Sequence, residues 1–233
     1  MTDADTPRVC EPYYRDDHVT LYHGDCRDIT EWLDADILVS DPPYGIGWKR
    51  GAKKGRWDTG SAGIANDDDT SCRDTALELW GDRPAAVFGS FYAPEVRGKK
   101  HVLVFRKPPD SGVVGSATGW RRDLEPIFLT GRWPRRAAHS SSLITTGLRA
   151  AGNPSSPAGR FQHPHAKPLD VMETLIRACP PGVIADPFSG SGSTLVAAKL
   201  QGRKAIGVEL EERYCEIAAR RLAQDALPFG GAA

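Results

Sequence analysis

Short apolar runs bounded by turn residues dominate the first 130 residues of the chain. Runs of about four to eight apolar residues between Gly, Pro and Asp are typical of buried strands. The pattern predicts strands at 19–22, 36–40, 85–89, 101–106 and 126–130. Helical spacing is weaker here and predicts one or two turns within 27–33 and a helix at 75–80.

Regular alternation of helix and strand patterns begins at Lys167. The pattern predicts, in order, a helix at 169–176, a strand at 183–186, a helix at 194–200, a strand at 205–208 and an amphipathic helix at 212–224. A strand-loop-helix-strand-helix order is the signature of a doubly wound parallel sheet. We therefore expect the α/β class, with a mainly parallel sheet and helices on both faces.

Two long segments between these elements show no clear periodicity. Residues 45–69 are rich in Gly, Lys and Asp, and residues 133–159 are rich in Ser, Gly, Pro, Ala and Arg. Long loops in compact domains are commonly functional. We predict a loop at 45–69 and an extended connection without regular structure at 133–159.

The bulk composition fits one globular domain. The 233 residues, 40% hydrophobic and 26% charged, are enough for a single α/β domain with a full core. The sequence contains no run of about 18 apolar residues, which argues against a membrane span. The acidic N-terminal segment lacks the apolar region of a secretory signal, so we expect a cytoplasmic protein.

The cysteines are five in number and widely scattered: Cys10, Cys26, Cys72, Cys179 and Cys215. None belongs to a Cys-x-x-Cys pair, so the spacing suggests neither a zinc site nor a disulfide framework. We expect reduced thiols and no bound metal.

The net charge is zero, but the charges are unevenly distributed. Up to Asp41, eleven acidic residues stand against Arg8, Arg15 and Arg27. Three acids accompany the ten basic residues of the middle segment, which are Arg97, Lys99, Lys100, Arg106, Lys107, Arg121, Arg122, Arg132, Arg135 and Arg136. Such a basic segment is typical of a face that binds a polyanion, although a solvated surface gives the same pattern.

A Gly- and Ser-rich turn, Asp186-Pro187-Phe188-Ser189-Gly190-Ser191-Gly192-Ser193-Thr194, joins a predicted strand to a predicted helix. Glycines at such a turn let a ligand approach the backbone, and the free amides of the helix start favour negative groups. Glu209 ends the next predicted strand, where its carboxylate can accept hydrogen bonds from ribose hydroxyls. The pattern predicts a cofactor that contains a nucleoside.

NAD fits this turn poorly. The fingerprint Gly-x-Gly-x-x-Gly lacks its third glycine, because Leu195 stands there. Asp186 would repel a pyrophosphate but attract the amino group of a methionine moiety. We therefore predict S-adenosylmethionine as the cofactor.

The tetrapeptide Asp41-Pro42-Pro43-Tyr44 follows a predicted buried strand, and its two prolines place it on a loop. The exocyclic amine of adenine or cytosine is a poor nucleophile because its lone pair is delocalised into the ring. Acceptors against its two N–H bonds, the Asp41 side chain and the Pro42 carbonyl, would localise that lone pair toward a methyl donor. Pro43 adds no competing amide donor, and Tyr44 offers a flat face for an extruded base.

These motifs resemble those of the DNA amino-methyltransferases. Their order is similar to that of the β group, in which the catalytic tetrapeptide precedes the cofactor loop. The resemblance covers residues 19–44 and 161–222, and the whole chain is similar to short methyltransferases of actinobacteria and their phages. It implies a circularly permuted, Rossmann-like fold in one methyltransferase domain, residues 1–233. Segments 45–69 and roughly 110–160 would then form a reduced target-recognition region.

The resemblance also implies roles for single residues. Asp186 would face the methionine amine, Glu209 would bind the ribose, and Asp25 would lie near the adenine of the cofactor. The other loop residues expected at the cofactor are Phe188, Ser189, Gly190, Gly192 and Thr194. His163-Pro164-His165-Ala166-Lys167-Pro168 matches a His-Pro-x-x-Lys-Pro element, which places Lys167 by the methionine end of the cofactor; the family often has Thr where His165 stands.

Contacts to DNA are expected from basic and aromatic residues. The loop 45–69 mixes cations and aromatic rings as nucleic-acid contacts do, although a solvated loop would look the same. The residues expected to bind nucleic acid are Trp48, Lys49, Arg50, Lys53, Lys54, Arg106, Lys107, Arg121 and Arg122.

The function expected is methyl transfer from S-adenosylmethionine to adenine N6 in duplex DNA, of the restriction–modification type, by a monomer or homodimer. In the family resembled, Asp at the head of the tetrapeptide mostly accompanies adenine, whereas Ser mostly accompanies cytosine N4, which stays the main alternative. No cysteine follows a proline, which argues against the cysteine-dependent C5-cytosine route. An RNA or protein-amide methyltransferase and a non-catalytic cofactor-binding protein are the alternatives from other classes.

Overall fold

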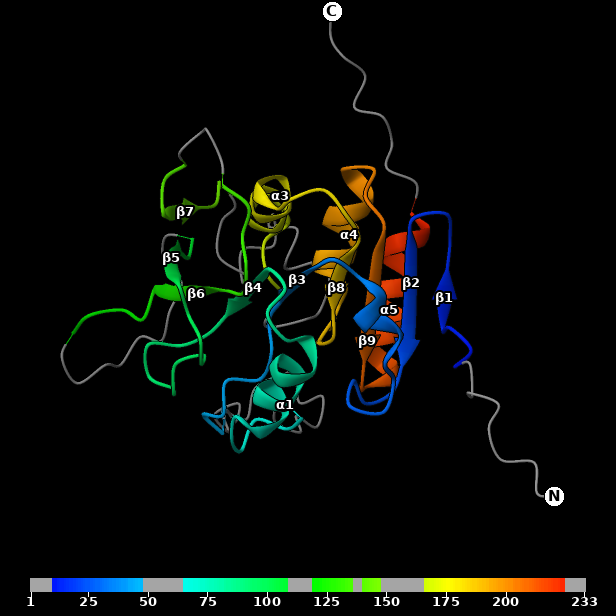
Figure 1. Ribbon diagram of the computed structural model, residues 1–233, viewed down its shortest axis with the longest axis horizontal. Coiled ribbons are helices and arrows are strands. Elements are labelled where there is room, and N and C mark those ends of the chain that lie inside the picture. The colour runs from blue at the N-terminus through cyan, green and yellow to red at the C-terminus, as the bar shows by residue number, and fades with distance from the viewer. Residues whose placement is uncertain (1–9, 48–64, 109–118, 136–139, 148–165, 225–233) are drawn as a thin grey trace, which may run out of the picture.

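A computed structural model describes residues 10–47, 65–108, 119–135, 140–147 and 166–224. Within these ranges, nine strands form one sheet in the order β1-β2-β9-β8-β3-β4-β6-β5-β7 (Figure 1). The strands are β1 (Tyr14–Arg15), β2 (Val19–His23), β3 (Ile37–Ser40), β4 (Ala85–Phe88), β5 (His101–Arg106), β6 (Leu124–Thr130), β7 (Leu143–Thr145), β8 (Ile184–Asp186) and β9 (Ala205–Glu209). The five adjacent strands β2-β9-β8-β3-β4 are parallel, and β6 is antiparallel to both of its neighbours. The predicted mainly parallel sheet is confirmed.

Helices cover both faces of the sheet. The helices are α1 (Ser71–Trp80), α3 (Leu169–Ala178), α4 (Ser193–Leu200) and α5 (Glu212–Ala223), with one 3-10 helix, η1 (Glu31–Asp34). On β3, Ile37 and Val39 enter the core shared with α3, α4 and α5, whereas Leu38 enters a second core with η1 and α1. Because both faces of β3 are buried, its residues are a continuous apolar run. None of the described helices is long and apolar enough to cross a membrane.

The predicted elements are confirmed, with shifts at their ends. The helix predicted at 75–80 begins earlier, at Ser71, and the turns predicted within 27–33 are the single 3-10 helix η1. The absence of regular structure predicted for 133–159 is wrong at β7, which pairs with β5. Three residues in a Ser-rich stretch are too few to show a strand pattern. Parts of both predicted loops, residues 48–64, 136–139 and 148–159, lie outside the described residues.

The order of the strands reverses between β8 and β3. From β8 the chain continues through α4 to β9, and from β3 it continues through α1 to β4 on the other side. Open α/β sheets bind ligands at such a switch point, outside the carboxyl ends of the strands. Asp186 ends β8, and Asp41 directly follows β3. The fold therefore brings the predicted cofactor loop and the predicted catalytic loop to the same place.

Candidate active site

Four acidic residues follow one another along the carboxyl edge of the sheet. Asp25 lies after β2, Glu209 ends β9, Asp186 ends β8 and Asp41 lies after β3, and these strands are neighbours in that order. Three gaps of about 4.8 Å between strands give a row about 14 Å long. This edge has room for an extended nucleoside that carries an amino-acid tail.

Asp186 is buried at the switch point and linked to β3. Its Oδ1 accepts a hydrogen bond of 2.6 Å from Ser40 Oγ and one of 3.2 Å from the backbone N–H of Phe188. Burial raises the pKa of Asp186 to about 6, although hydrogen bonds from Ser40 and Thr194 oppose the shift. These donors are neutral, so a cationic ligand would stabilise the ionised carboxylate. The ammonium group of a methionine moiety fits this position.

The glycine loop after β8 is folded against Glu209. Gly190 and Gly192 have φ values of 50° and 81°, which other residues rarely adopt. Glu209 Oε2 accepts a hydrogen bond of 2.7 Å from the Gly190 N–H, and Oε1 accepts one of 2.8 Å from the Glu211 N–H. Burial raises the pKa of Glu209, and these backbone donors oppose the rise. A carboxylate has about four lone-pair sites, so Glu209 keeps acceptor capacity for ribose hydroxyls.

Arg221 also holds this loop, and the sequence patterns did not point to it. Its guanidinium, on α5, donates hydrogen bonds to the carbonyl oxygen of Ser191 at 2.5 Å and to Ser193 Oγ at 3.3 Å. Burial lowers the pKa of Arg221 to about 10. In the sequence it is one basic residue on the polar side of an amphipathic helix, and only helix packing places it under the loop.

In the tetrapeptide, both carboxylate oxygens of Asp41 are engaged. Tyr44 Oη donates a hydrogen bond of 2.6 Å to Oδ1, and Lys167 Nζ lies 3.0 Å from Oδ2. The backbone N–H groups of Tyr44 and Gly45 donate to Oδ1 of the buried Asp67, at 2.8 and 2.9 Å. Asp67 belongs to the predicted loop 45–69, so the described end of that loop anchors the catalytic one.

Lys167 lies within the tetrapeptide's own network. We predict it beside the methionine end of the cofactor, and the structure places its ammonium group between Asp41 and Glu125, 3.1 Å from Glu125 Oε2 and 3.0 Å from Tyr44 Oη. The ammonium also lies 4.9 Å from the centre of the Phe88 ring. Burial by itself would lower the pKa of Lys167, but the charges of Asp41 and Glu125 raise it well above the ordinary value. Lys167 therefore stays protonated at neutral pH.

Glu125, near the start of β6, is a second site residue that the sequence patterns did not reveal. Lys107 Nζ lies 2.7 Å from its Oε1, and its side chain is 12% exposed. Burial opposes ionisation, but Lys167 and Lys107 together lower the pKa of Glu125. The four residues Lys107, Glu125, Lys167 and Asp41 thus form a row of alternating charge. In the sequence Glu125 is one of a few acids in a basic segment, with no motif around it.

The residues predicted to contact DNA are only partly described. Lys107 is paired with Glu125, so its charge is engaged at the active site. Arg106 and Arg121 are exposed, and the guanidinium of exposed Arg122 lies 4.0 Å from the centre of the Tyr92 ring. The loop residues Trp48, Lys49, Arg50, Lys53 and Lys54 lie outside the described part of the chain.

Comparison with known protein families matches residues 98–220 to a family model described as DNA methylase. YubD of Escherichia coli (strain K12), a protein named as a methylase, is 31% identical over an alignment of 230 residues that covers 90% of this chain and 93% of YubD. The type II methyltransferase M.ScaI of Streptomyces caespitosus is 45% identical over 78 residues. That match is local, covering 33% of this chain and 26% of M.ScaI.

Two solved structures share the fold. The M1.HpyAVI–SAM complex matches with a TM-score of 0.58 at 22% identity, covering 88% of this chain and 99% of that one. The PvuII DNA methyltransferase, described as cytosine-N4-specific, matches with a TM-score of 0.62 at 16% identity, covering 94% and 91%. The predicted methyltransferase fold is thereby confirmed. Because the family model spans more than half of the chain and the match to YubD covers 90% of this chain and 93% of YubD, the chain belongs to the DNA methylase family.

Proposed function

We propose that this protein transfers a methyl group from S-adenosylmethionine to N6 of adenine in duplex DNA. The observation that carries the proposal is a hydrogen bond between β3 and β8. Ser40, the residue before Asp41, donates its hydroxyl to Asp186 Oδ1 at 2.6 Å. This contact joins a carboxylate suited to a methionine ammonium to a carboxylate suited to an exocyclic amine. S-adenosylmethionine, when bound, supplies an electrophilic methyl group on a sulfonium.

The residues along the carboxyl edge would divide the binding of the cofactor. Asp186 attracts the ammonium group, since burial raises the pKa of its carboxylate to about 6 even though neutral donors oppose the rise. Glu209 accepts the ribose hydroxyls, and Asp25 lies one strand further along, on the adenine side. The turn that follows Asp186 would supply the other residues at the cofactor, which are Phe188, Ser189, Gly190, Gly192 and Thr194. The cofactor named in the M1.HpyAVI–SAM complex, which has the same fold, supports this proposal.

Asp41 has to exchange partners when a target base enters. In the structure its carboxylate receives the Tyr44 hydroxyl and the Lys167 ammonium. An incoming amine must donate its N–H to the same oxygens, so these contacts loosen. Glu125, 3.1 Å from Lys167, keeps the ammonium paired during the exchange, so no buried charge is left alone. The freed Asp41 carboxylate then faces the nitrogen on which positive charge develops.

Glu125→Gln should lower kcat/KM for DNA about 10–100-fold, because a hydrogen bond to a charged group contributes about 1.5–3 kcal/mol. Without the Glu125 charge, Lys167 binds Asp41 more tightly and competes with the base. Cofactor affinity should not change. Steady-state kinetics with varied DNA, together with calorimetric titration of the cofactor, measure both quantities.

A matched control is Glu95→Gln, which removes an exposed carboxylate paired with Lys99 outside the site. Equal rates for the two variants would contradict the role of Glu125. A loss of cofactor affinity in Glu125→Gln would also contradict it.

The choice of adenine rests on Asp41 at the head of the tetrapeptide. The alternative is cytosine N4, which is supported by the likeness to a PvuII enzyme described as cytosine-N4-specific. Both amines have the same delocalised lone pair and need the same two acceptors, so the chemistry of the loop serves either base.

Incubation with labelled S-adenosylmethionine and unmethylated DNA tests the proposal. Nuclease digestion and mass spectrometry should find N6-methyladenine, with no label in RNA or protein substrates added in parallel. N4-methylcytosine would replace the adenine assignment and leave the reaction class intact. Salt weakens phosphate contacts steeply, so the assay is run over a salt series. Absence of label from DNA at every salt concentration would overturn the proposed function.

A further inference from the structure

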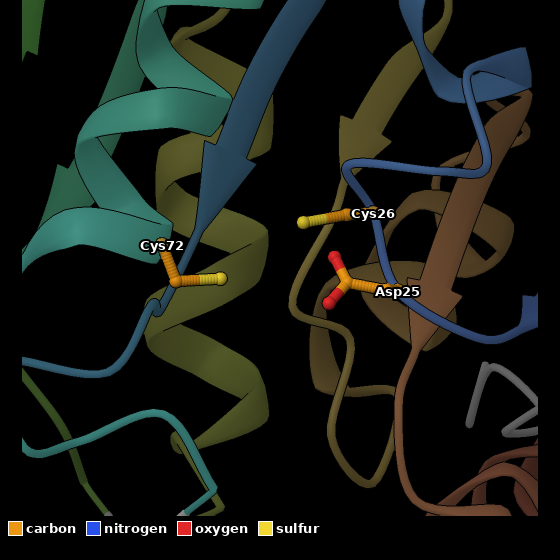
Figure 2. A group of neighbouring side chains, drawn as sticks. All are labelled: Asp25, Cys26 and Cys72. Atoms are coloured by element: carbon orange, nitrogen blue, oxygen red, sulfur yellow. The ribbon is translucent and has the colours of Figure 1, made fainter.

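Three side chains with metal-binding atoms converge between the loop after β2 and the first turn of α1. Asp25 and Cys26 follow β2, and Cys72 is the second residue of α1. One carboxylate oxygen and the two Sγ atoms all lie within 4.8 Å of one another. Figure 2 shows the sulfur atoms of Cys26 and Cys72 and the carboxylate of Asp25 directed toward the same space. The two segments that carry them are far apart in the sequence and are brought together by the packing of α1.

Core packing accounts for the two cysteines, and Arg27 binds both carboxylate oxygens of Asp25, Nε to Oδ1 at 2.8 Å and Nη2 to Oδ2 at 2.5 Å. Cys26 and Cys72 are each 3% exposed, and a buried thiol commonly packs as a small apolar group. The Asp25 side chain is 19% exposed, and besides its contacts with Arg27 one of its carboxylate oxygens lies within 4.8 Å of both sulfur atoms. A carboxylate and two thiols form a set of donors that binds metals well. Zinc takes sulfur at about 2.3 Å and carboxylate oxygen at about 2.0–2.2 Å, which puts tetrahedral ligand atoms roughly 3.5–4 Å apart. The three donor atoms, within 4.8 Å of one another in the structure, would have to move closer together to reach that spacing.

The local charges also favour a divalent cation. Metal binding requires both sulfurs as thiolates, which together with Asp25 give three negative charges. Arg27 Nε donates to Asp25 Oδ1 at 2.8 Å and contributes one positive charge. A bound dication brings the sum to zero, as buried charges require.

We propose that Asp25, Cys26 and Cys72 bind one thiophilic divalent cation, with Zn²⁺ as the metal that this ligand set matches best. The fourth coordination position is left for water or an added ligand. The two thiol protons are released to solvent, and no oxidation state changes. The proposal does not depend on which base the protein methylates.

A metal here would join the cofactor edge of the sheet to the catalytic loop. Cys72 Sγ accepts a contact of 3.9 Å from Asn66 Nδ2, and the next residue, Asp67, holds the backbone of Tyr44 and Gly45. Fixing Cys72 to the loop after β2 therefore restrains the segment that anchors the tetrapeptide.

The test uses the purified full chain, stripped with a chelator and titrated with Zn²⁺ or Co²⁺. We expect one metal ion per chain by elemental mass spectrometry after gel filtration. Co²⁺ should produce the near-ultraviolet absorption of a cobalt–thiolate bond. With Zn²⁺ at about 100 times its Kd, the midpoint of thermal unfolding should rise by about 5–10 °C.

Cys26→Ser and Cys72→Ser should each lose the bound metal and the thiolate absorption. Cys179→Ser, at a buried cysteine that directly follows α3, is the matched control and should keep both. Asp25→Asn keeps the shape of the side chain and should weaken Zn²⁺ affinity by at least about 10–100-fold, the loss typical when a group that hydrogen-bonds to a metal ligand is removed. The cobalt–thiolate absorption should be retained. This variant tests the site even if a cysteine variant does not fold.

Three results would overturn the proposal. The first is no stoichiometric metal in the reduced protein. A second is binding that survives in both cysteine variants, because other donors would then hold the ion. The third is a Cys26–Cys72 disulfide found by mass spectrometry in protein that binds no Zn²⁺ when reduced, which would make the pair a redox site.

Discussion

Asp41→Ala is expected to lower kcat for methyl transfer by roughly 10²–10⁴-fold, the range for a positioned acceptor at the reacting group. The reason is that the variant leaves the exocyclic amine with the Pro42 carbonyl as its remaining acceptor, so the lone pair stays in the ring. Cofactor affinity should not change, because Asp186 and Glu209 lie on neighbouring strands and keep their partners. Single-turnover rates with labelled cofactor and calorimetric titration measure the two quantities separately.

We also expect this variant to fold. Removal of the Asp41 carboxylate leaves Lys167 paired with Glu125, so the buried ammonium is not left without a counter-charge. Asp17→Ala, at an exposed carboxylate near β2, is the control and should retain the wild-type rate. A parallel fall of rate and cofactor affinity in Asp41→Ala would show that the division of labour between Asp41 and Asp186 is wrong.

Asp186→Asn is expected to weaken cofactor binding strongly while stabilising the protein without its cofactor. Loss of one partner of a buried charge pair costs about 2–5 kcal/mol, which corresponds to roughly 30- to 5,000-fold in Kd. Ser40 can still donate to the amide oxygen, so the local structure is kept. Calorimetry at pH 8 measures the loss of affinity.

The gain in stability follows from the pKa of Asp186. Burial raises this pKa from 3.8 to about 6, so the folded protein holds the proton more tightly than the unfolded chain. The contribution to the free energy of unfolding is complete below the ordinary pKa and is lost as pH rises through 6. Each pKa unit corresponds to 1.36 kcal/mol, so ionised Asp186 costs about 3 kcal/mol at pH 8.

The asparagine variant has no such loss, and urea unfolding at pH 5 and pH 8 compares the two proteins. In the wild type, cofactor affinity should also fall as pH drops below 6, because the neutral carboxyl no longer attracts the ammonium. An asparagine variant that is less stable than the wild type at pH 8 would contradict the destabilising effect of the ionised Asp186 carboxylate.

The edge that carries the site could be predicted from the sequence because its signals are local. Two prolines after an apolar run end a strand wherever they occur, which placed Asp41 on a loop at a strand end. Glycines between a strand pattern and a helix pattern likewise indicated a turn with exposed backbone amides. Carboxyl ends of neighbouring parallel strands share one edge, and the pairing of β3 with β8, which the structure shows, brings Asp41 and Asp186 together there.

The partners of these carboxylates depend on contacts between distant segments. Glu125 from β6, Lys167 from before α3 and Asp41 from after β3 meet only because β4 and β6 pair antiparallel, which brings the start of β6 to the carboxyl edge. The residues that flank Glu125 or Arg221 in the sequence do not indicate strand direction or helix packing, so the contacts of these two side chains could not be predicted. The same holds for Cys26 and Cys72, whose spacing in the chain argued against a metal.

The tetrapeptide, the glycine loop and the α/β class were thus determined by the sequence itself, because turn chemistry and hydrophobic periodicity act over a few residues. The charge row from Lys107 to Asp41, the Arg221 support of the cofactor loop and the cluster at Asp25 were decided only by the tertiary structure. Their interactions depend on distances through space, which the spacing of residues along the chain does not contain.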